Sequence, residues 1–257
     1  MRKKNGFLIL IVLLVLGVHA KTTEKKTRPG QILNTETRIQ PGTLYYIDFP
    51  ELGLTWHNKP ARAGIYFPTD YTTDKHYPLF VWFGGGAGSD YPGRAMDITE
   101  GKEYICVALP YCSEENGRNG GWQTPWSYYE TMLEQLETLV PNVDPRKRVC
   151  GGYSSGGAAI MYQLGNSAGA FQNYFHAFMP GGAGWPMGGL DRIKGRPMLV
   201  FVGEKDKRRP NLEKINEEAS AAGVDITFLV LEDTAHKFPP ACYPRLRQWL
   251  YENVTAR

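Results

Sequence analysis

The sequence predicts an α/β fold with a mostly parallel central sheet flanked by helices, and three observations lead to it. Short apolar runs alternate with stretches of helical periodicity from residue 43 to the C-terminus. Several of these runs end in Gly or Pro, as strands that lead into turns do. The 257 residues, 42% of them apolar, are enough for one sizeable core but not for two, so we expect one domain over residues 43–257.

The expected strands are short apolar runs rich in β-branched and aromatic side chains. They cover residues 79–83, 104–109, 148–150, 175–179, 198–202 and 226–231. One or two leading antiparallel strands are expected within residues 43–66. Because parallel strands need crossover connections, the stretches between the later runs should form helices on the faces of the sheet.

The clearest expected helix covers residues 126–140, where apolar side chains recur at helical spacing until Pro141 ends the pattern. Further helices are expected from about Ser155, over residues 212–222 and over residues 243–254. No insertion between these elements is long enough for a large lid. We therefore expect a compact domain with an open cleft.

The first twenty residues predict a secretory signal. Three basic residues at positions 2–4 precede an apolar run over residues 7–18, and small residues precede a cleavage site after Ala20. The run is short for a membrane-spanning helix, although an uncleaved anchor is the alternative. We expect a secreted or periplasmic protein without stable membrane insertion after cleavage, in which residues 21–42 are a loose segment.

Composition argues against two function classes. The signal holds three basic residues and no acidic ones, so the mature chain is close to neutral, and no basic stripe with interleaved aromatics indicates a nucleic-acid partner. The spacing of the four cysteines matches neither a zinc site nor a CxxC redox pair, so we expect no metal site. The oligomeric state cannot be inferred from these features.

Export to an oxidising compartment allows disulfides. Cys112 and Cys242 are expected on loops at the same edge of the sheet, which makes them the more plausible pair. Cys106 and Cys150 fall within or beside apolar strands, where a small buried side chain is the favoured interpretation.

The strongest local signal for chemistry is the pentapeptide Gly152-Tyr153-Ser154-Ser155-Gly156. It follows an expected strand and opens an expected helix, which is the context of a nucleophile elbow. The tight turn needs small residues two positions before and two after the nucleophile, so the pattern favours Ser154 and not Ser155. The alternative is a Gly-rich strand-to-helix turn without chemistry.

A serine nucleophile needs a histidine to accept its proton and an acid to orient that histidine. His236 stands in a polar loop after the last expected strand and is the candidate base, although it could also be a surface histidine without a role. Asp206 follows the strand that ends at Val202 and is the candidate acid. Glu204 is its nearest rival and Asp233 a distant one.

The developing oxyanion needs hydrogen-bond donors, and backbone amides serve because they are fixed before the reaction begins. Gly84-Gly85-Gly86 follows an expected strand and lets the backbone approach a substrate closely. We expect the amides of Gly85 and Ser155 to be the donors, with Gly86 in reserve. A lone triglycine can be a flexible turn, but the chain order of oxyanion loop, serine, acid and histidine favours a catalytic triad.

With these motifs, the chain from about residue 61 onward resembles the α/β-hydrolase superfamily, and within it the secreted polyhydroxybutyrate depolymerases and feruloyl esterases. Beside the elbow, the resemblance rests on residues 82–86, 143–149, 203–206 and 236–239. These families usually place His at the position of Phe83 and Trp at the position of Phe238. These two departures do not affect the predicted triad, but they leave the substrate undecided.

The resemblance implies a serine esterase, which requires no cofactor. The expected substrate is a small-molecule or polysaccharide-linked ester, and aromatic residues near the cleft favour an aryl or sugar ester. Trp122, Trp126 and Trp185 are candidate substrate-binding residues, because they follow expected strands and flat aromatic walls suit such esters. The alternative for Trp126 is an anchor of the helix that it opens. A serine peptidase of the same fold and a non-catalytic carbohydrate-binding protein on a hydrolase scaffold are the competing functions.

Overall fold

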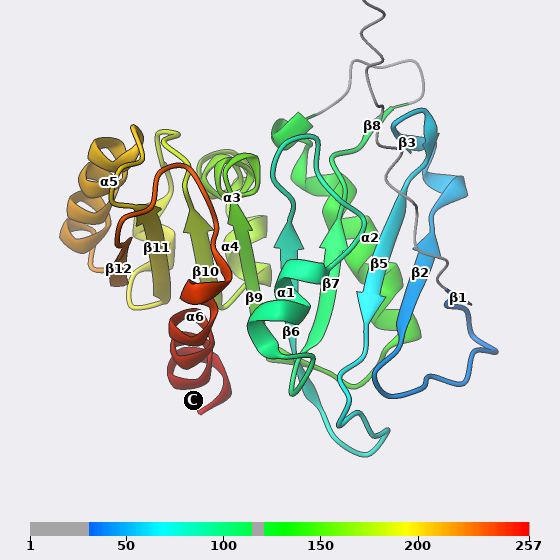
Figure 1. Cartoon of the computed structure of the whole chain (residues 1–257). Helices are drawn as coiled ribbons and strands as arrows, with labels where there is room; N and C mark the ends of the chain where they lie inside the picture. The colour runs from blue at the N-terminus through cyan, green and yellow to red at the C-terminus, as the bar shows by residue number, and fades with distance from the viewer. Residues whose placement is uncertain (1–30, 115–120, 257) are drawn as a thin grey trace, which may run out of the picture.

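The computed structural model describes residues 31–114 and 121–256 (Figure 1). The predicted signal over residues 1–20 lies outside the described residues. Within them, nine strands form one sheet. In spatial order these are β1 (Gln31–Ile32), β2 (Leu44–Asp48), β5 (Arg62–Tyr66), β7 (Ile105–Leu109), β6 (Tyr77–Phe83), β9 (Val143–Tyr153), β10 (Ala177–Gly181), β11 (Pro197–Gly203) and β12 (Asp225–Leu231).

The sheet is mostly parallel, as the sequence predicts. Strands β7, β6, β9, β10, β11 and β12 run parallel to one another, and β5 pairs antiparallel with both β2 and β7. The expected leading antiparallel strands are therefore β2 and β5. The parallel strands place their carboxyl ends at one edge of the sheet, where loops that follow different strands meet.

Helices cover both faces of the sheet (Figure 1). They are α1 (Gly93–Thr99), α2 (Trp126–Leu139), α3 (Ser155–Asn166), α4 (Ala170–Tyr174), α5 (Arg209–Ala221) and α6 (Tyr243–Leu250), which a π-helical turn (Tyr251–Thr255) extends. The apolar side chains of α2 to α5 pack on one face, and those of α1 and α6 pack on the other. In β6 the alternation is visible, since Leu79, Val81 and Phe83 belong to the first core and Phe80 and Trp82 to the second.

Two segments differ from the sequence-based expectation. Residues 31–42, expected to be loose, include β1, which pairs with β2, and the buried side chain of Leu33. Strand β9 begins at Val143, well before the expected start at Arg148, because Val143 already pairs with Tyr77 of β6. The register is irregular between this pair and the next one, Arg148 with Leu79, and the residues between them are mostly charged. A short second sheet of β4 (Lys59–Pro60), β3 (Leu54–Trp56) and β8 (Ser113–Glu114) lies beside the main one.

The expected disulfide between Cys112 and Cys242 is wrong, because all four cysteines are free thiols. The prediction placed the two loops at the same edge of the sheet and did not distinguish its two faces. Cys112 instead belongs to the core on the α2–α5 face and Cys242 to the core on the α1–α6 face, so the sheet separates them. Cys106 and Cys150 are buried, as expected.

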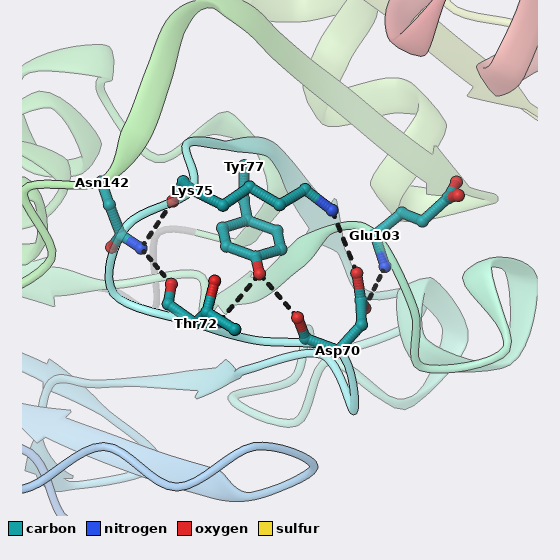
Figure 2. Close-up of polar contacts among 6 residues, drawn as sticks. All are labelled: Asp70, Thr72, Lys75, Tyr77, Glu103 and Asn142. Carbon is teal, nitrogen blue, oxygen red and sulfur yellow. Dashed lines mark hydrogen bonds and ion pairs between the residues drawn. The ribbon is translucent and has the colours of Figure 1, made fainter.

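A polar network at the amino ends of the parallel strands holds the loop that leads into β6. Figure 2 shows its members Asp70, Thr72, Lys75, Tyr77, Glu103 and Asn142. The Tyr77 hydroxyl donates to the Asp70 carbonyl (2.7 Å) and accepts from the Thr72 amide (2.8 Å). The Asn142 amide group donates to the carbonyls of Thr72 (3.3 Å) and Lys75 (3.1 Å). These bonds tie side chains to loop backbone, so they fix the loop's path.

Over the described ranges, no helix combines the length and the apolar content needed to cross a membrane.

Candidate active site

The turn between β9 and α3 has the geometry of a nucleophile elbow. Ser154 stands at the turn with φ 59° and ψ −118°, a backbone conformation that a residue with a side chain adopts only under strain. A Cβ atom at Gly152 would lie 2.5 Å from the Gly156 backbone, and one at Gly156 would lie 2.0 Å from the Phe83 carbonyl oxygen. Both glycines are therefore needed for the turn to close against β6.

Two hydrogen bonds connect Ser154, His236 and Asp206. The distance from His236 Nε2 to Ser154 Oγ is 2.9 Å, and the distance from His236 Nδ1 to Asp206 Oδ2 is 2.6 Å. The three residues follow β9, β12 and β11, so the carboxyl edge of the sheet brings them together. The imidazole is 34% exposed, whereas the Asp206 side chain is fully buried behind it.

The surroundings of Asp206 keep its carboxylate ionised. Burial alone would raise its pKa, but hydrogen bonds from the Arg208 backbone N–H (3.0 Å) and from His236 outweigh burial, and the pKa lies below the ordinary value. The Arg208 guanidinium, 3.5 Å from Oδ1, acts in the same direction. A charged carboxylate can therefore face His236 Nδ1 at neutral pH.

The two rival carboxylates are engaged elsewhere. Glu204 accepts a hydrogen bond from the backbone N–H of Asp233 (2.9 Å), and the Asp233 carboxylate pairs with Lys205 at the surface. Of the three candidate acids, Asp206 is the one whose carboxylate bonds to His236. In the part of the chain that the structure describes, no three His, Cys, Asp or Glu side chains gather in a group that could hold a metal ion.

The glycine loop after β6 lies against the elbow. A Cβ atom added to Gly85 would be 3.8 Å from the Ser154 Cβ, so the Gly85 backbone passes directly beside the serine. Ser155 is the first residue of α3, and its N–H has no acceptor within the helix. Gly86 has φ +62°, which favours glycine there. The backbone of all three expected donors is thus within the loop and helix start that flank Ser154.

A stack of aromatic rings supports the histidine from the α1–α6 face. The Tyr153 ring stacks on the His236 imidazole with centroids 5.2 Å apart and planes 23° apart. Phe238 stacks on Tyr153 at 5.2 Å, and Trp82 stacks on Phe238 at 5.6 Å. Sequence reasoning did not single out Tyr153 for this contact, although strand alternation from the elbow places its ring on that face.

The expectation that Trp126 binds substrate is wrong. Its side chain is only 5% exposed and packs among Tyr129, Phe171, Tyr174 and Phe175. As the first residue of α2, it shares the buried face of that helix with Tyr129, three positions along the chain. Trp126 therefore anchors the helix, which was the alternative interpretation.

Trp122 and Trp185 form an aromatic pair nearer the surface. Their ring centroids are 4.5 Å apart, and Trp122 also contacts Tyr162 of α3 at 5.9 Å. Trp185 follows β10 and is 38% exposed. The structure therefore leaves two of the three candidate tryptophans available to a ligand.

Comparison with known proteins identifies the fold. Neither a protein-family model nor a curated protein matches the sequence. Among solved structures, Thermogutta terrifontis esterase 2 phosphorylated by paraoxon aligns with a TM-score of 0.58 and 17% identity, over 76% of this chain and 88% of that one. A fungal esterase from Rhizomucor miehei aligns with a TM-score of 0.61 and 14% identity, over 85% and 86% of the respective chains. The chain therefore has the α/β-hydrolase fold of these esterases.

Proposed function

We propose that the protein hydrolyses carboxylic esters, with Ser154 as nucleophile, His236 as general base and Asp206 as the acid that orients the histidine. The hydrogen-bonded chain from Ser154 Oγ through the imidazole to the buried Asp206 carboxylate, at a strained strand-to-helix turn, is the observation that carries this proposal. The fold shared with esterases supports it, and so does the phosphorylation of one of them by paraoxon.

In the acylation half-reaction, Ser154 Oγ attacks the ester carbonyl carbon while His236 Nε2 takes the hydroxyl proton. The Asp206 carboxylate stabilises the imidazolium that forms, and the Tyr153 ring stacked on it restricts its rotation. The tetrahedral intermediate collapses when the alcohol leaves with the proton from Nε2. The product is an acyl group on Ser154.

Deacylation repeats these steps with water as the nucleophile. His236 Nε2 takes a proton from water, the hydroxide attacks the acyl carbon, and the proton returns to Ser154 Oγ as the acid leaves. In both half-reactions the negative oxygen receives hydrogen bonds from the amides of Gly85 and Ser155, with Gly86 as the reserve donor.

The proposed substrates are aryl or carbohydrate-linked esters, including esters borne by polysaccharides. The exposed Trp185 and its partner Trp122 offer flat apolar surfaces on which an aromatic acyl group or a sugar ring can stack. Residues 2–20 support export of the enzyme to the place where such polymers occur.

The test is hydrolysis of p-nitrophenyl acyl, feruloyl and acetyl-sugar esters by the mature protein, in parallel with Ser154→Ala. We expect turnover by the wild type, its loss in the variant, and stoichiometric labelling of Ser154 by a fluorophosphonate. Turnover of peptide amides but not esters would replace the esterase with a peptidase. A folded wild-type protein that neither turns over substrate nor takes the label would contradict both.

A further inference from the structure

A buried side chain that the proposed mechanism does not use holds the glycine loop beside Ser154. Tyr111, which follows β7, is 3% exposed, and its hydroxyl donates a hydrogen bond to the Gly84 carbonyl oxygen. Its ring fills the space under the far end of the loop, because a Cβ atom at Gly88 would lie 2.9 Å from the ring. Tyr111 therefore holds both ends of the segment from Gly84 to Gly88.

The hydrogen bond from Tyr111 acts on the peptide group that joins Gly84 to Gly85. The Gly84 carbonyl and the Gly85 N–H belong to one planar trans peptide group, in which they point in opposite directions. A donor fixed on the carbonyl therefore sets the direction in which the N–H points, and it polarises the N–H as a hydrogen bond in series does. Gly85 is the residue whose backbone passes beside Ser154.

A second chain of hydrogen bonds acts in the same way on the next peptide group, which joins Gly85 to Gly86. The Trp56 indole Nε1–H, from the small second sheet, donates to the Ala87 carbonyl (2.9 Å). The Gly88 N–H, in the same peptide group as that carbonyl, donates to the Gly85 carbonyl (3.2 Å). The Gly85 carbonyl in turn shares its peptide group with the Gly86 N–H, the reserve donor.

We infer that Tyr111 is a positioning residue for the oxyanion hole, which orients and polarises the Gly85 N–H through the Gly84 carbonyl, and that Trp56 does the same for Gly86 through Gly88. The inference rests on the proposed function. Burial raises the pKa of the Tyr111 hydroxyl, so it is protonated and able to donate at neutral pH. Donors held in place before the reaction are the arrangement that stabilises an oxyanion most effectively.

Tyr77 provides a matched control at the other edge of the sheet. Like Tyr111, it is a buried tyrosine whose hydroxyl donates to a loop carbonyl, that of Asp70 (Figure 2). Tyr77→Phe and Tyr111→Phe each remove one hydroxyl and keep the ring. Both variants should unfold at a lower denaturant concentration than the wild type, but only one should change the chemistry.

The experiment measures kcat and KM for p-nitrophenyl acetate in the wild type, Tyr111→Phe, Tyr77→Phe and Trp56→Phe, with active sites counted by fluorophosphonate. We expect Tyr111→Phe to lower kcat and kcat/KM together by about tenfold, less than the about 100-fold or more that follows loss of a direct oxyanion donor. KM should change little, because the interaction acts in the transition state. Trp56→Phe should lower kcat by about threefold, since it acts on the reserve donor through one more hydrogen bond.

The results separate the inference from the proposed function. A kcat for Tyr111→Phe equal to that of Tyr77→Phe, in a wild type that hydrolyses the ester, would overturn the inference and leave the function intact. An inactive, unlabelled wild type would overturn the function itself. If Tyr111→Phe does not fold, Trp56→Phe provides the test, because the Trp56 side chain is partly exposed and its replacement should be tolerated. A kcat of Trp56→Phe equal to the wild-type value would then overturn the inference.

Discussion

Hydrogen bonds serve different purposes at the two edges of the central sheet. At the amino edge, Tyr77 and Asn142 bond to loop carbonyls and amides (Figure 2). At the carboxyl edge, Ser154, His236 and Asp206 bond to one another, and the imidazole is partly open to solvent. Hydrogen bonds from side chains to the backbone fix the path of a loop, whereas a chain of hydrogen bonds between side chains can transfer a proton.

Strand β9 connects the two edges. Asn142 directly precedes it and Ser154 directly follows it. The loop network and the proposed nucleophile therefore stand at opposite ends of the same strand. Substitutions at the two edges of the sheet should separate into losses of activity at the carboxyl edge and losses of folding free energy at the amino edge, and the following predictions test that separation.

The largest effect is expected at the carboxyl edge. Asp206→Asn should lower kcat by about 10³- to 10⁴-fold, because the amide cannot hold the imidazole tautomer or stabilise its charged form. The measurement is ester hydrolysis normalised to folded protein. The matched control is Asp70→Asn at the amino edge, which should keep kcat within about twofold. An Asp206→Asn enzyme with nearly full kcat would remove the acid from the mechanism.

The second effect belongs to the amino edge. Asn142→Ala should lower the free energy of unfolding by about 2–3 kcal/mol, because it removes two donated bonds and the one accepted from the Tyr71 hydroxyl (3.1 Å). Urea titration measures this loss, and kcat should stay unchanged. Asn166→Ala, an exposed asparagine at the end of α3, is the control that should change stability little. A fall in kcat at residue 142 would mean that the two edges are coupled through β9.

The third prediction concerns the pH dependence of stability. The pKa of Asp206 lies below its ordinary value of 3.8, so its ionised form stabilises the native state above that value, and this contribution is lost as pH falls through the native pKa. The stability advantage of the wild type over Asp206→Asn should therefore shrink as the pH falls from about 5 to below the ordinary value of 3.8. Urea titrations of both proteins across that range measure it. An advantage that grows toward acid would contradict the assignment.

The smallest effect is expected at the rim of the amino-edge network. Lys75 and Asp70 form an ion pair at 3.1 Å with both side chains well exposed. Lys75→Met should lower the free energy of unfolding by at most about 1 kcal/mol, and less in high salt, since exposed pairs are weak and screened. Urea titration at two salt concentrations checks this. A larger, salt-independent loss would indicate that Lys75 fixes the loop in the manner of Asn142.

The apolar strands of the sheet could be predicted because each one is a buried run that ends in a turn residue. Strand β9 could be predicted only in its second half, since residues 144–148 are mostly charged and the strand's pairing with β6 is irregular between Val143 and Arg148. Strand β1 is two exposed residues long and carries no pattern of its own. For β1 the partner strand β2, and not the local sequence, supplies the stabilising contacts.

The grouping of Ser154, Asp206 and His236 could be inferred from their order along the chain, because the parallel strands bring their following loops to one edge. Side-chain direction could not be inferred in the same way. Trp126 opens a helix and points into the core, and the Tyr111 hydroxyl reaches the Gly84 carbonyl across a turn. Both depend on how packed elements are rotated, which a single sequence does not specify.

The four free thiols can report on local unfolding of the protein. Cys112 and Cys150 lie under the α2–α5 layer, and Cys106 and Cys242 lie under the α1–α6 layer. All four thiols are buried, and burial raises the pKa of Cys112 to about 12 and that of Cys242 to about 11. We therefore expect a thiol-specific reagent to react with them mainly after the covering helices unfold locally. The order in which the four sites are alkylated under mild denaturant therefore records which layer of the protein opens first.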